Sequence, residues 1–173
     1  MAMENNLPKI HQSSLKYCIG PRRYVEYIYD FGVEFAERFL GKSIFGLFWS
    51  NSVSHNDWRD SATIDQRMVD YFHEMDFRDI FENNVVVFLS DHGARWGPLI
   101  YKKGGYIEER LPMLFLHLPQ WFQNKYPDMV WALKQNRNRL TSPYDLHMTL
   151  KHLALMSLGK EHKADEMAVP VSC

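Results

Sequence analysis

Val85-Val86-Val87-Phe88-Leu89-Ser90-Asp91-His92-Gly93 is the stretch that decides the predicted fold class of this 173-residue chain. Its first five residues are apolar, and three of them are β-branched, which predicts a strand buried on both faces. Such strands belong to parallel sheets covered by helices, in which ligands bind just beyond the carboxyl ends of the strands. Asp91 and His92 stand at that place, so we expect a functional site there.

Asp91 and His92 also have the right chemistry for a metal site. A carboxylate oxygen beside an imidazole nitrogen is a common ligand pair for a divalent transition metal. Gly93 would let the backbone turn sharply after the pair. The same residues have a structural explanation, with Asp91 as a turn or helix cap and His92 as a loop histidine. Both explanations are open at the level of the sequence.

Composition limits the classes of function. The chain is long enough for one domain with a hydrophobic core. Lys and Arg number 20 against 21 Asp and Glu, a net charge of -1 that argues against nucleic-acid binding and against attachment to a membrane surface. No apolar run reaches the length of a membrane span, and residues 1–14 lack the apolar core of a signal peptide. We therefore expect no nucleic-acid partner and no membrane insertion by this chain.

The order of predicted elements indicates an α/β fold. The elements are an irregular lead-in over 1–17, a helix over 21–40, a strand over 44–49, a helix starting near Ser61 or Thr63, strands over 85–89 and 111–118, a helical stretch over 119–134 interrupted at Pro127, a helix over 143–158, and a loose tail over 159–173. This alternation predicts a mostly parallel sheet flanked by helices. Three strands make a narrow sheet, which a partial domain would explain.

Four more residues are candidates for a site with Asp91 and His92. His55 follows the strand predicted over 44–49, Lys102 and Lys103 lie in the loop after Gly93, and His147 lies early in the last helix. Imidazoles, a carboxylate and cations on one edge of a sheet suit an anionic, oxygen-rich substrate held near a metal. Each also has a structural explanation: a turn histidine, two solvated loop lysines and a histidine at the edge of the core.

Several motifs occur in the order found in one known family. They are Cys18-Ile19-Gly20, Phe45-Gly46-Leu47-Phe48-Trp49, Ser54-His55-Asn56-Asp57, Phe88-Leu89-Ser90-Asp91-His92-Gly93, Arg95-Trp96-Gly97, Glu108-Glu109-Arg110-Leu111-Pro112, Leu118-Pro119-Gln120-Trp121-Phe122 and Pro143-Tyr144-Asp145-Leu146-His147. Over residues 18–158 the chain resembles the carboxyl-terminal half of the DUF229 family, sulfatase-like proteins of the alkaline phosphatase superfamily. The resemblance implies part of an α/β sandwich whose metal centre hydrolyses sulfate or phosphate esters, with the amino-terminal half missing.

The resemblance also implies roles for the candidates. Asp91 and His92 match the metal ligands of the strand-end motif. His55 looks like the histidine that contacts the substrate anion or the leaving group, and Lys102 or Lys103 resembles the lysine that faces the same anion. We therefore expect these residues to meet at one metal-dependent ester-binding site.

The resemblance implies a cofactor, partners and a location as well. These are a divalent metal of the zinc, calcium or manganese class, an anionic ester of a small molecule or glycan, and an extracellular or secretory location, although the chain shows no signal peptide. His147 stands where the family often has a histidine, and no role is assigned to it.

The departures from the family pattern lead to a further expectation. Nothing before Cys18 resembles the metal-binding acid of the first strand or the hydroxyl or modified-cysteine nucleophile, and Cys18 lacks the sequence context of that cysteine. We therefore expect a fragment of a metal-dependent ester hydrolase that is inactive as this chain and binds metal weakly or not at all. The alternative is a non-catalytic anion-binding or interaction protein derived from that fold. Because half of the domain would be missing, we also expect an unpaired sheet edge and exposed apolar surface, and hence marginal stability or self-association.

Overall fold

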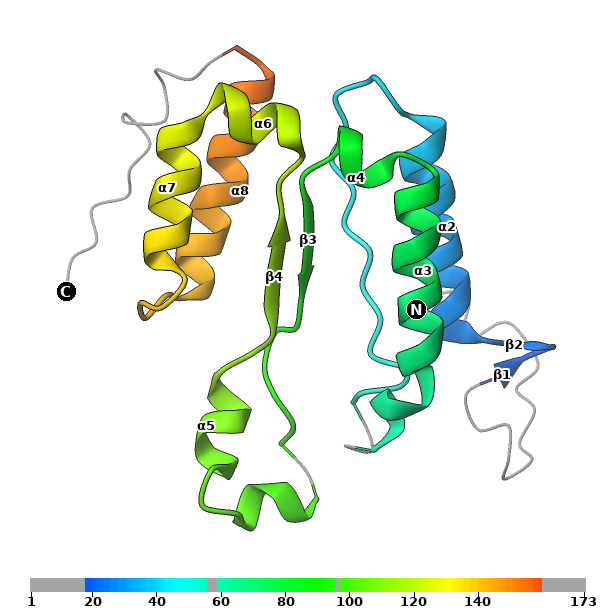
Figure 1. Ribbon diagram of the computed structural model, residues 1–173. Helices are drawn as coiled ribbons and strands as arrows, with labels where there is room; N and C mark the ends of the chain where they lie inside the picture. Colours follow the sequence, from blue (N-terminus) through cyan, green and yellow to red (C-terminus); the bar gives the residue numbers. More distant parts are fainter. Residues whose placement is uncertain (1–17, 56–58, 96, 160–173) are drawn as a thin grey trace. The chain divides into compact units, whose positions relative to one another are not determined.

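The computed structural model describes residues 18–55, 59–95 and 97–159. They fall into two compact units: residues up to 42 with 46–121 make the first, and residues 43–45 with 122 onward make the second. The predicted lead-in over 1–17 and the predicted tail beyond Gly159 lie outside the described residues. Figure 1 labels the helices and strands. None of the described helices is both long enough and apolar enough to cross a membrane.

Two helices are the longest elements of the first unit. Helix α2 runs over Tyr24–Arg38 and helix α3 over Asp65–Phe77, with the short helix α4 (Ile80–Asn83) after α3. The sequence predicts the first two, and the structure confirms them. Together with neighbouring segments they supply two clusters of buried residues: Val25, Val53 and Ile64 in one, and Val33, Tyr71 and Ile80 in the other.

Short elements flank these helices. Strands β1 (Cys18–Ile19) and β2 (Arg22–Arg23) pair antiparallel just before α2. The turn between them places Gly20 at a φ of 61°, a left-handed conformation that glycine adopts without strain. A 3₁₀ turn, η1 (Asp60–Ile64), leads into α3 and so marks the helix start expected near Ser61 or Thr63.

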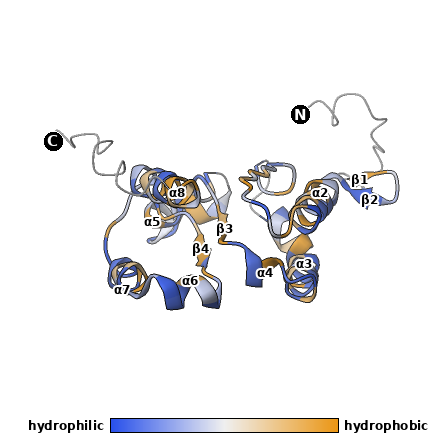
Figure 2. Ribbon diagram, turned by 90° about the horizontal axis from the view of Figure 1, so that it is seen from above, coloured by the Kyte–Doolittle hydropathy of each residue, from blue (hydrophilic) through white to orange (hydrophobic). Residues whose placement is uncertain are grey.

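The stretch that decides the predicted fold class forms strand β3 (Val86–Leu89), and its partner is β4 (Leu114–His117). Both strands are expected from the sequence, and Figure 2 shows their hydrophobic character. Val86 packs against the second buried cluster, and the Phe88 ring meets the Phe72 ring of α3 edge-on at 5.5 Å. The face of β3 that carries Phe88 therefore contacts α3.

The prediction of a mostly parallel sheet is wrong for the described strands. β3 pairs antiparallel with β4, with Val86 opposite His117 and Leu89 opposite Leu114. The reason lies in the connection, which leaves the carboxyl end of β3 and enters β4 at the same end. A parallel pairing requires a crossover that returns the chain to the opposite end. The connection instead contains the 3₁₀ turn η2 (Pro98–Tyr101) and helix α5 (Gly105–Arg110). The α/β class holds, since the described chain combines helices and strands.

The strand predicted over 44–49 is also absent: the structure assigns no strand there. The Phe48 ring instead packs against the rings of Phe31 and Phe35 on α2, each at a centroid distance of 5.8 Å. Aromatic composition favours strands because aromatic side chains pack well on a pleated, half-buried surface. Here the surface of a helix gives the ring its packing partners.

The regular elements in the described part of the second unit are helices. Helix α6 (Gln120–Lys125) enters it, followed by α7 (Pro127–Asn136) and α8 (Pro143–Ser157). The predicted interruption at Pro127 is confirmed, because this proline opens α7, where its missing N–H costs no helical hydrogen bond. At the start of α8, the backbone N–H and the hydroxyl of Ser142 both donate to Asp145 Oδ2 at 2.7 Å. These bonds lower the pKa of the Asp145 carboxyl.

Candidate functional site

Asp91 and His92 lie directly beyond the carboxyl end of β3, as the sequence predicts. Ser90 extends the strand pair by one residue, since its N–H donates to Met113 O at 3.0 Å and its Oγ accepts from the Met113 N–H at 3.1 Å. The side chain of Asp91 is 56% exposed and that of His92 is 33% exposed. The pair is therefore fixed to a hydrogen-bonded strand end and still open to solvent.

The two side chains turn toward each other. His92 Nε2 lies 3.5 Å from Asp91 Oδ2, and the His92 N–H donates to Asp91 Oδ1 at 3.0 Å. On the other side of the ring, Nδ1 lies 2.7 Å from the carbonyl oxygen of Gly93. A carbonyl can only accept, so Nδ1 carries the proton, and in the neutral ring Nε2 keeps its lone pair.

The separation of the two atoms is compatible with two ligands of one metal ion. Zinc ligands about 2.1 Å from the ion and at the tetrahedral angle are about 3.4 Å apart, close to the observed separation of Nε2 and Oδ2. Metal-binding histidines usually donate their second ring N–H to a carbonyl or carboxylate, as His92 does to Gly93. Within the described residues, no cluster of three or more His, Cys, Asp and Glu side chains is arranged to hold a metal. The described donor set is therefore the Asp91–His92 pair alone.

Gly93 is needed for a reason that differs from the sharp turn predicted from the sequence. It is not among the glycines with positive φ. Instead, a Cβ at Gly93 would lie 1.8 Å from the carbonyl oxygen of Glu108 in α5, and the Gly93 N–H donates to Glu109 O at 3.0 Å. A side chain here would collide with the backbone of α5. The sequence between Gly93 and Glu108 carries no signal for this contact.

Charged side chains join the same loop and helix. The Glu109 carboxylate lies 3.8 Å from Arg95 Nε and 2.9 Å from an Arg110 guanidinium nitrogen. Arg110 in turn covers the ring of Tyr106, with Cζ 3.7 Å from the ring centroid. Arg95, two residues after Gly93 in the chain, is thereby paired with the carboxylate of Glu109 on α5.

The other predicted site residues are not brought to the pair by any described contact. Lys102 and Lys103 are exposed between η2 and α5, and no hydrogen bond or ion pair of the described chain joins them to Asp91 or His92. His55 is exposed in a turn, where its N–H donates to Asn51 O at 3.1 Å. His147 is exposed on α8, in the second unit.

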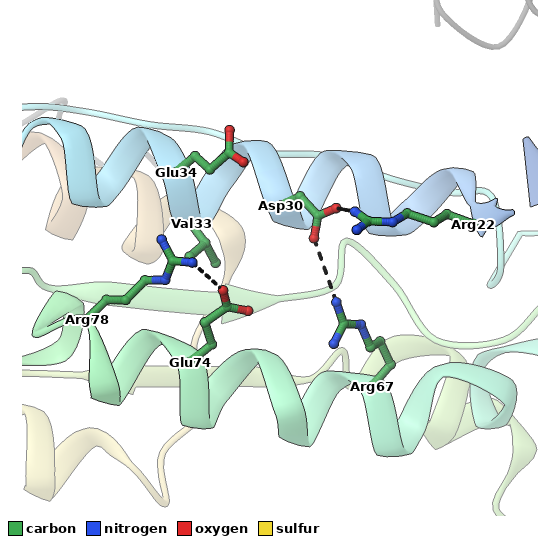
Figure 3. A pocket seen from close by; sticks show the side chains of 7 residues that line it. All are labelled: Arg22, Asp30, Val33, Glu34, Arg67, Glu74 and Arg78. Carbon is green, nitrogen blue, oxygen red and sulfur yellow. Dashed lines mark hydrogen bonds and ion pairs between the residues drawn. The ribbon is translucent and has the colours of Figure 1, made fainter. Parts of the chain in front are cut away.

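A second polar region, not predicted from the sequence, is a groove of about 220 Å³ along α2 and α3 (Figure 3). It is lined by Arg22, Asp30, Val33, Glu34, Arg67, Glu74 and Arg78. We call it the α2–α3 groove. Acidic residues at i, i+4 and i+7 on α2 (Asp30, Glu34 and Glu37) are matched by Arg67 on α3 and Arg78 directly after it, and these opposite charges are the signal that could have found the groove.

The charges of the α2–α3 groove bind one another. Asp30 pairs with Arg22 and lies 3.9 Å from Arg67, while Arg78 pairs with Glu37 on α2 and lies 2.7 Å from Glu74. The Asp30–Arg67 and Glu37–Arg78 pairs join α2 to α3 and the residue that follows it, and Figure 3 shows the contacts of Asp30 with Arg22 and Arg67 and of Arg78 with Glu74. The guanidinium groups of the groove are therefore engaged by carboxylates of this chain.

Tyr71 forms the buried end of this network. It is 2% exposed, and its hydroxyl donates to Asp30 Oδ1 at 2.6 Å. Burial, together with this bond to a carboxylate, raises the pKa of Tyr71. Arg67 lies over the Tyr71 ring, with Cζ 4.5 Å from its centroid. The network is a structural link between α2 and α3.

Comparison with known protein families identifies the family of this chain. A family described as "Protein of unknown function (DUF229)" matches residues 1–171. The chain belongs to this family. Neither the curated proteins nor the solved structures gave a significant match.

Proposed function

We propose that this chain carries the Asp-His metal-ligand pair of a sulfatase-like ester hydrolase of the alkaline phosphatase superfamily. The observation that carries the proposal is the geometry of Asp91 and His92, whose Oδ2 and Nε2 atoms are 3.5 Å apart. The Nδ1–H bond to Gly93 leaves Nε2 ready to bind a metal. The motif resemblance supplies the reaction class, sulfate or phosphate ester hydrolysis, and an extracellular or secretory setting.

A divalent metal of the zinc, calcium or manganese class would supply a Lewis acid for the ester oxygens and lower the pKa of the attacking hydroxyl. The residues of this chain would bind the metal and orient the ester. Asp91 and His92 would hold the metal, with the His92 ring fixed by Gly93. His55 and Lys102 or Lys103 would contact the anionic oxygens of the ester. His147 is a further candidate for substrate binding, but we assign it no specific role.

The pair by itself falls short of a catalytic centre. Catalytic zinc usually has three protein ligands and one open position, whereas the described donors are two. The resemblance identifies no nucleophile among the residues of this chain. We therefore propose that this chain, tested alone, binds metal weakly and turns over no ester.

Metal titration of the purified chain tests the proposal. We expect zinc or manganese binding that Asp91→Asn and His92→Gln each weaken by about tenfold or more, since each removes one of two ligands. The matched controls are Asp76→Asn and His73→Gln on the exposed side of α3, which should leave affinity unchanged. Equal affinity in all four variants would refute the metal pair. Metal-dependent hydrolysis of aryl sulfate or aryl phosphate esters would refute the proposed inactivity.

A second candidate is a non-catalytic interaction protein, favoured by the apolar surface of the β3–β4 pair. Phe115 is 64% exposed, Leu114 49% and Met113 40%. An exposed strand with apolar side chains is a template for pairing with another copy of the same chain. Sedimentation velocity tests this: dimers that Phe115→Lys dissociates would favour self-association, and a monomer at all concentrations would exclude it.

A further inference from the structure

Helix α5 packs against the residue that follows the metal pair. The N–H of Gly93 donates to Glu109 O at 3.0 Å, and the carbonyl oxygen of Glu108 occupies the space a Cβ at Gly93 would need. This contact brings the backbone of the last turn of α5 directly against the backbone of Gly93. A shift of α5 would therefore shift Gly93.

Gly93 also sets the state of the His92 ring. Its carbonyl oxygen accepts the Nδ1–H of His92 at 2.7 Å, and this bond selects the tautomer whose Nε2 keeps a lone pair. Released from this acceptor, the ring can take the other neutral tautomer, whose Nε2 carries the proton and cannot bind metal. One residue thus contacts α5 through its N–H and the ligand ring through its C=O.

The other end of α5 is fixed in the same manner. Gly105 is buried, its N–H donates to Lys102 O at 2.8 Å, and a Cβ there would lie 2.3 Å from Leu99 O in η2. Gly104, the preceding residue, has open space where a Cβ would stand. The position of α5 therefore depends on close backbone packing at Gly105, twelve residues along the chain from Gly93.

We infer that α5 is a positioning element for the metal pair: packed at Gly105 against η2, it holds Gly93 through Glu109 and thereby fixes the tautomer of His92. The carboxylate of Glu109 contributes less than its backbone, because its partners Arg95 and Arg110 are half exposed and exposed ion pairs are weak. The consequence for metal affinity rests on the proposed function, whereas the consequence for the tautomer holds in the metal-free chain.

The experiment compares two adjacent glycines. Gly105→Ala should displace α5, and Gly104→Ala, the same substitution one residue earlier, should not. Long-range ¹H–¹⁵N NMR of the metal-free chain at pH 8 reports the tautomer of His92. We expect the Nδ1–H tautomer in the parent chain and in Gly104→Ala, and a rise in the Nε2–H tautomer in Gly105→Ala and Gly93→Ala. Zinc affinity, measured by competition with a chromophoric chelator, should fall about tenfold or more in the latter two.

Two results would overturn the inference. One is a His92 tautomer that stays unchanged in both Gly93→Ala and Gly105→Ala. The other needs no variant: hydrogen exchange at the Gly93 amide that is as fast as exchange at an exposed amide, because the bond to Glu109 O should slow it. If the parent chain binds no zinc, the proposed function fails, and the tautomer comparison still decides the role of α5.

Discussion

The α2–α3 groove and the Asp91–His92 turn are both rich in polar side chains, yet they use them differently. In the groove, guanidinium groups and carboxylates pair with one another across two helices. In the turn, a carboxylate and an imidazole nitrogen lie 3.5 Å apart, and a backbone carbonyl orders the ring from its far side.

The difference separates stabilising networks from binding sites. A polar side chain that is already paired within its own chain has little capacity left to bind a ligand. An imidazole ring that is held in place through one nitrogen keeps its other nitrogen available for a metal. The groove is a hollow lined by charged side chains, but the turn is the better candidate site. This conclusion makes opposite predictions for the two regions: substitutions in the groove should change stability alone, and substitutions in the turn should change metal binding.

Gly93→Ala should have the largest effect. The new methyl group collides with the Glu108 carbonyl, so α5 or the turn must move, and we expect a loss of about 2–3 kcal/mol in the free energy of unfolding. Chemical denaturation followed by circular dichroism measures this. Gly104→Ala, with no neighbour in the way, should stay within about 0.5 kcal/mol of the parent chain. Equal stability of the two variants would mean that α5 does not pack against Gly93.

Tyr71→Phe should come next and act on the groove alone. It removes a buried hydroxyl that donates to a carboxylate, at a cost of about 1–2 kcal/mol. Zinc affinity should be unchanged, because Tyr71 belongs to the network between α2 and α3. A variant that lost zinc binding while folding normally would contradict the separation of the two regions.

The same residue predicts a dependence on alkaline pH. The pKa of Tyr71 is raised in the folded chain, so above about pH 10 the unfolded chain releases this proton first and stability falls with rising pH. The stabilising contribution is fully present below the unfolded pKa. Denaturation curves between pH 9 and 11 should therefore decline less steeply for Tyr71→Phe than for the parent chain. Parallel declines would show that Tyr71 titrates alike in both states.

Glu109→Gln should have the smallest effect. It removes the charge that attracts Arg95 and Arg110 but leaves the backbone oxygen that accepts from Gly93. Exposed ion pairs contribute up to about 1 kcal/mol, so stability should change little and the His92 tautomer should be the same. A change of the His92 tautomer in this variant would show that the Glu109 side chain, and not the backbone of α5, positions Gly93.

Local patterns in the sequence predict much of the first unit. The spacing of apolar residues gives α2 and α3, and the β-branched run gives β3 with Asp91 and His92 at its end. In the second unit, the interruption predicted at Pro127 is confirmed, since α6 ends before it and α7 begins there. These features depend on neighbours within a few residues, which is the range that a sequence pattern reports.

Features that depend on distant contacts were missed. The antiparallel pairing of β3 with β4 follows from where the connection returns, and the requirement for Gly93 follows from a helix fifteen residues later. Phe48 belongs to an apolar run that predicts a strand, yet its ring packs against a helix. In each case the deciding partner is remote in the chain, and local propensity gives way to packing.

The most direct test of the account is a zinc titration followed by NMR of the ¹⁵N-labelled histidine rings, of which the chain has eight. We predict that the His92 Nε2 resonance shifts first and saturably, that Nδ1 keeps its proton, and that Asp91→Asn weakens this response while His73→Gln leaves it intact. If other histidines respond to zinc while His92 does not, Asp91 and His92 are not a metal pair and the central claim is wrong.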